Sequence, residues 1–303
     1  MLYKQENPGD WGQMQGAPGI TTATEKLTAA DGYELFLRSW KTNGPDVLLI
    51  LHGLGGHSGW YIDMGNELAS RGISVYAMDH RGFGRSGGLR GHIDNYRTFV
   101  EHIGYIVTEI RKRHPEAGIF LLGHSMGAIF ATHFAAQDQQ RLAGVVFLNP
   151  WVGDTSRVSL GTTLGVLLGG VFKSRRYRQF AGGTEGMTTN EEAVQMLQAD
   201  SFWQRTQTSS FMFQVLLMRS AILKQARQIT IPALVMQAED DKSVLHEGSR
   251  KLYEALASSD KTWKTYADYD HDSQFEEDRS QMDKDLVAWI REHSISTSRV
   301  AAK

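Results

Sequence analysis

One short stretch, residues 118–131, most constrains how this chain can fold. The apolar run at residues 118–122 predicts a buried strand, and the residues after Ser125 predict a helix. Between them stands Gly-His-Ser-Met-Gly, an instance of the Gly-x-Ser-x-Gly pattern in which a strand turns sharply into a helix. Gly123 and Gly127 leave room for this turn because neither carries a Cβ. The stretch therefore predicts that Ser125 projects from the turn as a nucleophile.

Two other glycine patterns overlap at residues 82–88 and indicate different chemistry. A second Gly-x-Ser-x-Gly surrounds Ser86, but no apolar strand leads directly into it and no helix follows directly. Residues 82–87 also match Gly-x-Gly-x-x-Gly, which is typical of dinucleotide-binding oxidoreductases when it opens a helix at once. Here no helix is expected before about Asp94, so the oxidoreductase is a remote alternative.

Apolar runs and amphipathic stretches alternate along most of the chain. Besides residues 118–122, strands are expected at residues 33–40, 47–51, 73–78, 144–149, 233–237 and 262–266. Besides the helix after Ser125, helices are expected at about residues 60–70, 94–113, 245–258 and 279–293. Residues 1–25 are expected to form a loose lead-in. The alternation predicts an α/β fold with a mostly parallel sheet flanked by helices.

The alternation stops after Pro150 and resumes near residue 230. Residues 151–229 contain helical stretches and glycines, but no run typical of a buried strand. We therefore expect one α/β core, formed by residues 1–150 and 230–303, with a helical insertion at residues 151–229 placed over the strand ends as a cap.

Composition excludes several classes of function. The chain has 32 lysines and arginines against 34 acidic residues, a formal net charge of −2, so no general basic field favours nucleic acid. It contains no cysteine, which excludes disulfides, thiolate metal sites and a cysteine nucleophile. The N-terminus lacks a signal-peptide core, and no apolar run reaches about twenty residues. These features predict a cytoplasmic protein without a transmembrane segment.

A serine nucleophile requires a base, and this architecture orders the three residues as serine, acid and histidine. That order leaves His246, His271 and His293 as candidates. His246 falls in the first turn of an expected helix, and His293 at the frayed end of the last helix. His271 follows the strand at residues 262–266 on a loop, where an imidazole can reach the serine. The pattern therefore favours His271 as the base.

The acid is expected on the loop after the strand at residues 233–237. Three adjacent carboxylates, Glu239, Asp240 and Asp241, stand there, and the spacing alone does not distinguish them. Asp154, after the preceding strand, is a weaker candidate.

The oxyanion of an acyl transfer requires two backbone donors. The Met126 N–H directly follows the nucleophile, and the Leu54 N–H lies in the His-Gly-x-Gly loop after the strand at residues 47–51. His52 and His57 flank that loop, but no set of histidines and acids shows metal-ligand spacing. We therefore expect neither a metal nor an organic cofactor. The two histidines are expected to make hydrogen bonds that brace the loop.

Three segments, residues 52–61, 79–86 and 121–127, together resemble the monoacylglycerol lipase and lysophospholipase branch of the α/β-hydrolases. The similarity runs from about Leu27 to Glu292. It implies that Ser125 is the nucleophile, that Asp241 is the acid and that His271 is the base. Two departures are conservative: Ala238 stands where glycine is usual, and an alanine follows the turn where a second glycine is common.

The insertion bears on the substrate. Apolar residues recur at helical spacing between residues 160 and 172, and a basic run follows at residues 173–178. Such a helix can simply pack on its own domain, and the basic run can be a solvated helix end. The resemblance implies instead a cap helix that lines an acyl tunnel and contacts a lipid surface. Under that interpretation the substrate-binding residues are Leu164, Leu167, Leu168, Phe211 and Phe213.

The residues thus predict a serine carboxylic ester hydrolase that acts through an acyl-enzyme, and the resemblance implies that it cleaves monoacylglycerols or similar single-chain lipid esters. The close alternatives are a lysophospholipase, a short- or medium-chain carboxylesterase and a thioesterase; a non-catalytic binding protein is remote. The expected partner is a small lipid ester, with peripheral contact to membranes through the cap. The oligomeric state stays open.

Overall fold

The computed structural model describes residues 16, 18–153, 160–180 and 183–294 of the chain. Eight of the described strands form one sheet in the order β1-β2-β4-β3-β5-β6-β9-β10. β1 and β2 are antiparallel to each other, β2 is antiparallel to β4, and the remaining neighbours are parallel. The strands are β1 (Thr21–Thr28), β2 (Glu34–Lys41), β3 (Asp46–Leu51), β4 (Ser74–Met78), β5 (Gly118–His124), β6 (Gly144–Leu148), β9 (Ala233–Ala238) and β10 (Lys261–Tyr266).

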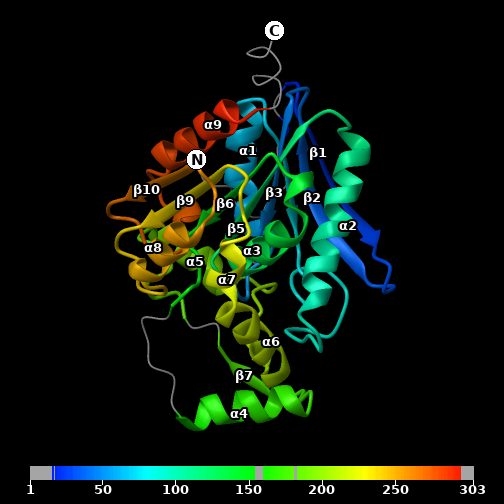
Figure 1. Ribbon diagram of the computed structural model, residues 1–303, viewed down its shortest axis with the longest axis vertical. Coiled ribbons are helices and arrows are strands. Elements are labelled where there is room, and N and C mark those ends of the chain that lie inside the picture. The colour runs from blue at the N-terminus through cyan, green and yellow to red at the C-terminus, as the bar shows by residue number, and fades with distance from the viewer. Residues whose placement is uncertain (1–15, 17, 154–159, 181–182, 295–303) are drawn as a thin grey trace.

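Helices cover both faces of this sheet (Figure 1). They are α1 (Ile62–Ser70), α2 (Arg97–Arg113), α3 (Met126–Asp138), α8 (His246–Ala255) and α9 (Ser280–Glu292). Every residue of β3, β4, β5, β6 and β9 is buried, which explains why these strands read as continuous apolar runs. The predicted α/β fold with a mostly parallel sheet is therefore confirmed.

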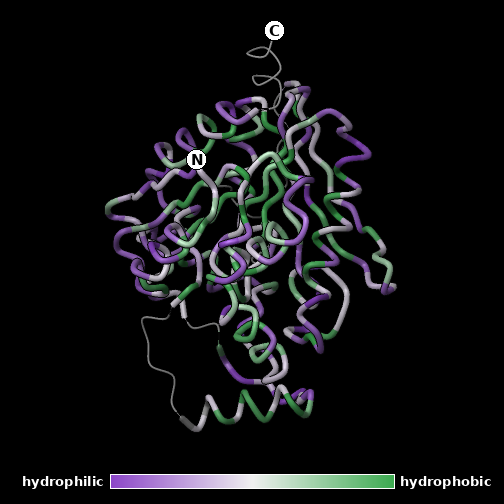
Figure 2. The backbone as a smooth tube through the Cα atoms, in the orientation of Figure 1, coloured by the Kyte–Doolittle hydropathy of each residue, from purple (hydrophilic) through white to green (hydrophobic). Residues whose placement is uncertain are grey.

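Alternate residues of each central strand enter different cores. On β3, Leu49 and Leu51 pack with α2 and α3, whereas Leu48 and Ile50 pack with α1 and α9 on the other face. Figure 2 shows these apolar strands in the interior and polar residues along the outer sides of the helices. The two hydrophobic cores, one on each face of the sheet, hold the ends of the strands in fixed positions.

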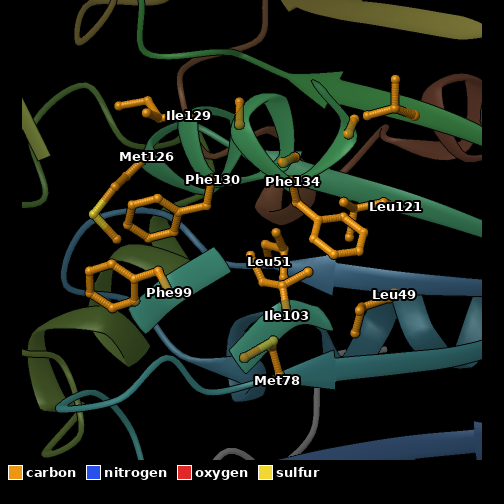
Figure 3. Packing of buried hydrophobic residues seen from close by; sticks show 14 of the residues in the cluster. Leu49, Leu51, Met78, Phe99, Ile103, Leu121, Met126, Ile129, Phe130 and Phe134 are labelled. Carbon is orange, nitrogen blue, oxygen red and sulfur yellow. The ribbon is translucent and has the colours of Figure 1, made fainter. Parts of the chain in front are cut away.

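The core beneath α3 is rich in aromatic rings. Phe130 of α3 stacks on Phe99 of α2 with ring centroids 4.5 Å apart, and His80 contacts Phe130 edge-on at 5.0 Å. Figure 3 shows this pair beside Met126, with Leu51 and Ile103 next to them. Phe130 is completely buried. The packing fixes the start of α3, where Ser125 lies.

The expectation of a loose lead-in over residues 1–25 was wrong for its last residues. Thr21–Thr28 forms β1, which pairs with β2 along its whole length. The segment Thr-Thr-Ala-Thr-Glu-Lys-Leu-Thr is polar because β1 is an edge strand with both faces partly exposed. β1 is stabilised by its hydrogen bonds to β2 and not by burial of apolar side chains, so the hydropathy pattern did not predict it.

The described part of residues 151–229 is mainly helical. It contains α4 (Leu160–Val171), α5 (Glu191–Ala199), α6 (Ser209–Ser220) and α7 (Ile222–Ala226). Two strands of three residues, β7 (Tyr177–Gln179) and β8 (Thr206–Thr208), pair there, although the sequence gave no strand signal. In Figure 1, α4 lies at the bottom, packed against α6 and away from the sheet. None of the described helices combines the length and the apolar character needed to cross a bilayer.

Phe130→Ala is expected to lower the free energy of unfolding by about 3–5 kcal/mol, because it leaves a cavity against Phe99 and His80. Urea unfolding followed by circular dichroism measures this change. Phe172→Ala is the control: Phe172 is 78% exposed, so its removal should change stability by less than about 0.5 kcal/mol. Equal losses in the two variants would show that the aromatic stack does not stabilise the core.

Candidate active site

Ser125 lies at the turn between β5 and α3 in a backbone conformation rare for a residue with a side chain, with φ 53° and ψ −114°. The flanking glycines are required by close contacts. A Cβ on Gly123 would lie 2.4 Å from the carbonyl oxygen of Gly127, and one on Gly127 would lie 2.2 Å from that of Leu51. The Ser125 N–H donates to the Leu148 carbonyl of β6 at 2.9 Å. Backbone contacts on both sides therefore hold the serine in this conformation.

Ser86, the serine of the second Gly-x-Ser-x-Gly copy, has a structural role. The Oγ of Ser86 accepts from the Phe36 N–H at 2.8 Å and donates to the Asp79 carbonyl at 2.7 Å. Both hydrogen bonds are buried, so this hydroxyl connects β2 to the loop after β4.

Three strand ends bring the candidate triad together. The Oγ of Ser125 lies 2.9 Å from Nε2 of His271, on the loop after β10. Nδ1 of His271 lies 2.7 Å from Oδ2 of Asp241, on the loop after β9. A carboxylate only accepts, so Nδ1 carries the proton and Nε2 of the neutral ring accepts from the serine hydroxyl. The hydrogen bonds thus point the serine proton toward the imidazole.

The structure separates the residues that the sequence left open. Oδ1 of Asp241 accepts from the backbone N–H groups of Ser243 and Val244, whereas Asp240 and Glu239 are exposed. His246 is exposed and packs on Trp263, and His293 contacts Asp260 at 3.1 Å, so neither approaches Ser125. Asp154 lies outside the described residues.

Burial and charge act in opposite directions on the pair formed by His271 and Asp241. Burial alone lowers the pKa of His271, but the Asp241 charge and hydrogen bond outweigh it, and the pKa is raised above 6.5. Burial alone raises the pKa of Asp241, but His271 and two backbone N–H groups lower it below 3.8. Asp241 is therefore ionised at neutral pH and stabilises a proton on the ring.

Hydrogen bonds to the backbone fix the loop that carries His271. The carbonyl oxygen of His271 accepts from Nδ2 of Asn149 at 2.6 Å and from Nε2 of His124 at 3.1 Å. Because His124 donates through Nε2, its Nδ1 accepts from the Tyr61 hydroxyl at 2.9 Å. Burial lowers the pKa of His124 to about 3, so the ring stays neutral. Sequence reasoning missed all three supports; the one signal was the position of His124 directly before the serine.

The two predicted oxyanion donors lie next to Ser125. Met126 is the first residue of α3, where backbone N–H groups have no acceptor within the helix. The loop with Leu54 lies directly against the nucleophile, since a Cβ on Gly53 would stand 3.3 Å from the Ser125 Cβ. Nε2 of His52 accepts from the His80 N–H, so its Nδ1 donates to the Gly53 carbonyl at 2.8 Å. That hydrogen bond orients the peptide that contains the Leu54 N–H.

A buried carboxylate connects this loop to the insertion. Oδ2 of Asp200, which follows α5, lies 2.8 Å from Nε2 of His57 and accepts from Trp60 Nε1 at 2.8 Å. His57 and Asp200 are almost fully buried. As expected, His52 and His57 make hydrogen bonds that brace the loop. The role of Asp200 had no sequence signal, because a single acid within a helical insertion is usually solvated.

A cavity of about 410 Å³ opens above Ser125. Its walls come from both parts of the chain: Gly53, Leu54, Trp60, His124, Ser125, Trp151, Phe180, Gly183, Glu185, Met187, Trp203, Lys242, Ser243, Val244, His271 and Asp272. Within the described ranges, no group of three or more histidines and acids could hold a metal ion. The cavity thus offers a nucleophile, a base and aromatic walls.

The five predicted substrate-binding residues do not line this cavity. Leu164, Leu167 and Leu168 are about half exposed on α4. Phe211 is fully buried in the core, 5.2 Å from the Phe83 ring, and Phe213 packs against α4. Helical spacing indicated one apolar face on this segment, but it could not indicate which way that face points.

Known proteins are similar to this chain over most of its length. The profile of the hydrolase family described as serine aminopeptidase, S33, matches residues 44–278. Human monoglyceride lipase is 32% identical over 245 residues, which cover 79% of this chain and 80% of that protein. The monoacylglycerol lipase of Mycolicibacterium smegmatis is 26% identical over 281 residues, with 90% and 98% covered.

A solved structure shows the same fold. The crystal structure of Paleococcus ferrophilus monoacylglycerol lipase superposes with a TM-score of 0.78 at 26% identity, covering 86% of this chain and 99% of that one. The family profile spans both the strand ends that carry Ser125 and His271 and the insertion between them. The chain therefore belongs to the serine aminopeptidase S33 family of α/β-hydrolases.

Proposed function

We propose that this chain hydrolyses monoacylglycerols, or similar single-chain lipid esters, to a fatty acid and an alcohol. The observation that carries the proposal is the hydrogen-bonded line from Asp241 through His271 to Ser125 at the base of the cavity. The relatives named as monoglyceride lipases supply the substrate class.

Acylation begins when the Ser125 Oγ attacks the ester carbonyl carbon while Nε2 of His271 takes the hydroxyl proton. The negative charge that develops on the carbonyl oxygen accepts hydrogen bonds from the backbone N–H groups of Leu54 and Met126. Asp241 remains ionised and stabilises the imidazolium. When the C–O bond breaks, His271 gives its proton to the leaving alcohol, and the acyl group stays on Ser125.

Deacylation repeats these steps with water. His271 takes a proton from a water molecule, the hydroxide attacks the acyl carbon, and the bond to Ser125 breaks as the proton returns to Oγ. The fatty acid leaves, and the enzyme is restored. Side chains and backbone donors supply every step, so the mechanism requires no cofactor.

Residues 151–229 act, in this proposal, as a cap on the core formed by residues 1–150 and 230–303. Trp151, Phe180, Met187 and Trp203 of the insertion line the same cavity as the nucleophile. The cap thus shields the acyl-enzyme from bulk water and surrounds the lipid chain.

The outer surface of α4 is the part of the cap that we propose contacts lipid. Val171, the last residue of α4, and Phe172, directly after it, are 70% and 78% exposed, next to the half-exposed leucines of the helix. Three cations follow directly and are exposed: Lys173, Arg175 and Arg176. Exposed apolar side chains beside basic ones suit the interface of an anionic membrane.

A lysophospholipase is the second candidate. The protein named phospholipase YtpA of Bacillus subtilis is 27% identical over 261 residues and is covered to 99% of its length. Monoacylglycerols and lysophospholipids share the single acyl chain and differ in the alcohol. A panel of the two substrates with matched chains, together with p-nitrophenyl esters and thioesters, separates the candidates.

Ser125→Ala is expected to reduce kcat/KM for monoacylglycerol at least about 10³-fold, because no other nucleophile attacks the ester. Labelling by a fluorophosphonate probe should disappear as well. Circular dichroism checks that the variant folds, and Ser220→Ala, an exposed serine on α6, is the matched control. Activity retained in folded Ser125→Ala would falsify the proposed function.

Asp241→Asn is expected to lower kcat/KM near neutral pH by about three orders of magnitude. It should also move the acid limb of the pH profile to lower pH. The base acts as neutral imidazole, so activity is lost as pH falls through the pKa of His271, and removing the Asp241 charge lowers that pKa. Asp240→Asn, at the exposed neighbour, should leave the profile unchanged. An unshifted limb in Asp241→Asn would argue against the assigned acid.

The double variant Val171→Ser with Phe172→Ser tests the lipid-contacting surface. Loss of the apolar area should weaken co-sedimentation with anionic phosphatidylglycerol vesicles at least about fivefold. Hydrolysis of a water-soluble short-chain ester should stay the same, because neither residue lines the cavity. Leu89→Ser, at an apolar residue exposed outside the cap, is the control. Unchanged vesicle binding would show that α4 does not contact the membrane.

A further inference from the structure

Asp272, the residue directly after His271, presents a carboxyl group to the cavity that the mechanism above does not use. It lines the cavity together with Ser125 and is only 3% exposed. Its Oδ1 accepts from Gln274 Nε2 at 3.0 Å and lies 3.8 Å from Nδ1 of His124. Among the described residues, Oδ2 has no hydrogen-bond partner. Burial raises the pKa of this carboxyl to about 6.

Three other buried acids around the site are paired with basic side chains. Asp241 holds His271, Asp200 holds His57, and Asp270 pairs with Lys242 at 3.1 Å. Asp272 differs from them in position: it lines the cavity, and its Oδ2 is not one of the fully buried atoms that lack a partner. A ligand group in the cavity can therefore donate the hydrogen bond that this oxygen does not receive from the protein.

The chemistry indicates which part of the substrate meets this wall. His271 must give its proton to the leaving oxygen, so the carbons attached to that oxygen lie beside His271. Asp272 follows in the same loop, and its backbone N–H donates to the carbonyl of Met187, which also lines the cavity. The acyl chain extends from the other side of the ester carbonyl. An acid on this loop that lines the cavity is therefore expected beside the alcohol and not beside the acyl chain.

We propose that Asp272 is a specificity-determining residue that binds the free hydroxyl groups of the leaving alcohol and so selects polyol esters. The inference rests on the proposed ester hydrolysis at Ser125. A carboxylate only accepts hydrogen bonds and hydroxyls donate them, so Oδ2 suits a vicinal diol such as that of a 1-monoacylglycerol. Lys242 also lines the cavity, which disfavours a cationic leaving group there. A site built to bind a hydroxyl discriminates strongly against substrates that lack it.

The test compares two esters of the same fatty acid: the 1-monoacylglycerol and the propyl ester, which has the same three-carbon skeleton without the hydroxyls. In Asp272→Val, the ratio of kcat/KM for the glycerol ester to that for the propyl ester should fall at least about tenfold. The loss should appear mainly in KM, because the hydroxyl contacts exist before the reaction. The 2-hydroxypropyl ester, with one hydroxyl, should show an intermediate change.

Two further variants keep the result interpretable. Asp272→Asn keeps the shape and an acceptor for Gln274, and should lower the ratio less, since a neutral amide binds hydroxyls more weakly than a carboxylate. Its result decides the question if Asp272→Val does not fold. Asp283→Asn, at a buried acid of α9, should leave the ratio unchanged because Asp283 does not line the cavity.

Each outcome has one meaning. A ratio that stays constant in Asp272→Val and Asp272→Asn overturns the inference, and so does an equal fall for both esters, which would mean that Asp272 only positions His271. A selective loss of choline ester hydrolysis in the Asp272 variants would show that Asp272 binds a cationic leaving group and not hydroxyl groups, and would likewise overturn the proposal. Failure of the proposed function itself would look different: the unaltered enzyme would hydrolyse neither ester.

Discussion

The close approach of α3 to β3 is the contact on which the site depends. The Gly127 backbone lies so near the Leu51 carbonyl that a methyl group there would stand 2.2 Å from the oxygen. That approach starts the helix directly after Ser125, so the serine keeps its positive φ and the Met126 N–H stays free for a ligand. The aromatic stack of Phe130 on Phe99 packs α3 against α2. A strained residue persists where its surroundings over-determine it.

The parallel strands around this turn position the other two residues of the candidate triad. β5, β9 and β10 end at the same edge of the sheet, so residues 125, 241 and 271 meet although the chain separates them widely. Each side chain is then fixed by a second set of bonds: Asp241 by two backbone N–H groups, and the His271 loop by Asn149 and His124. The charge on Asp241 offsets the effect of burial on the imidazole.

The sequence was most informative where local pattern and tertiary structure have the same cause. Strands buried on both faces must be apolar throughout, so the central strands could be predicted within a few residues, and the turn at Ser125 required glycine on both sides. β1 could not be predicted, because pairing at a sheet edge leaves no hydropathy signal. The choice among Glu239, Asp240 and Asp241 needed either a resemblance or the structure, since a loop has no fixed period that tells which side chain points to the site. The direction in which the α4 leucines point depends on tertiary packing, which spacing does not encode.

The buried contact of Asp200 with His57 and Trp60 bears on how such proteins diversify. One carboxylate from the insertion completes the hydrogen bonds of the loop that contains the Leu54 N–H. A segment without this acid would deprive the imidazole and the indole N–H of their shared buried acceptor. Residues 151–229 are thus not an interchangeable module, because exchanging them whole would also remove the acceptor that braces this loop.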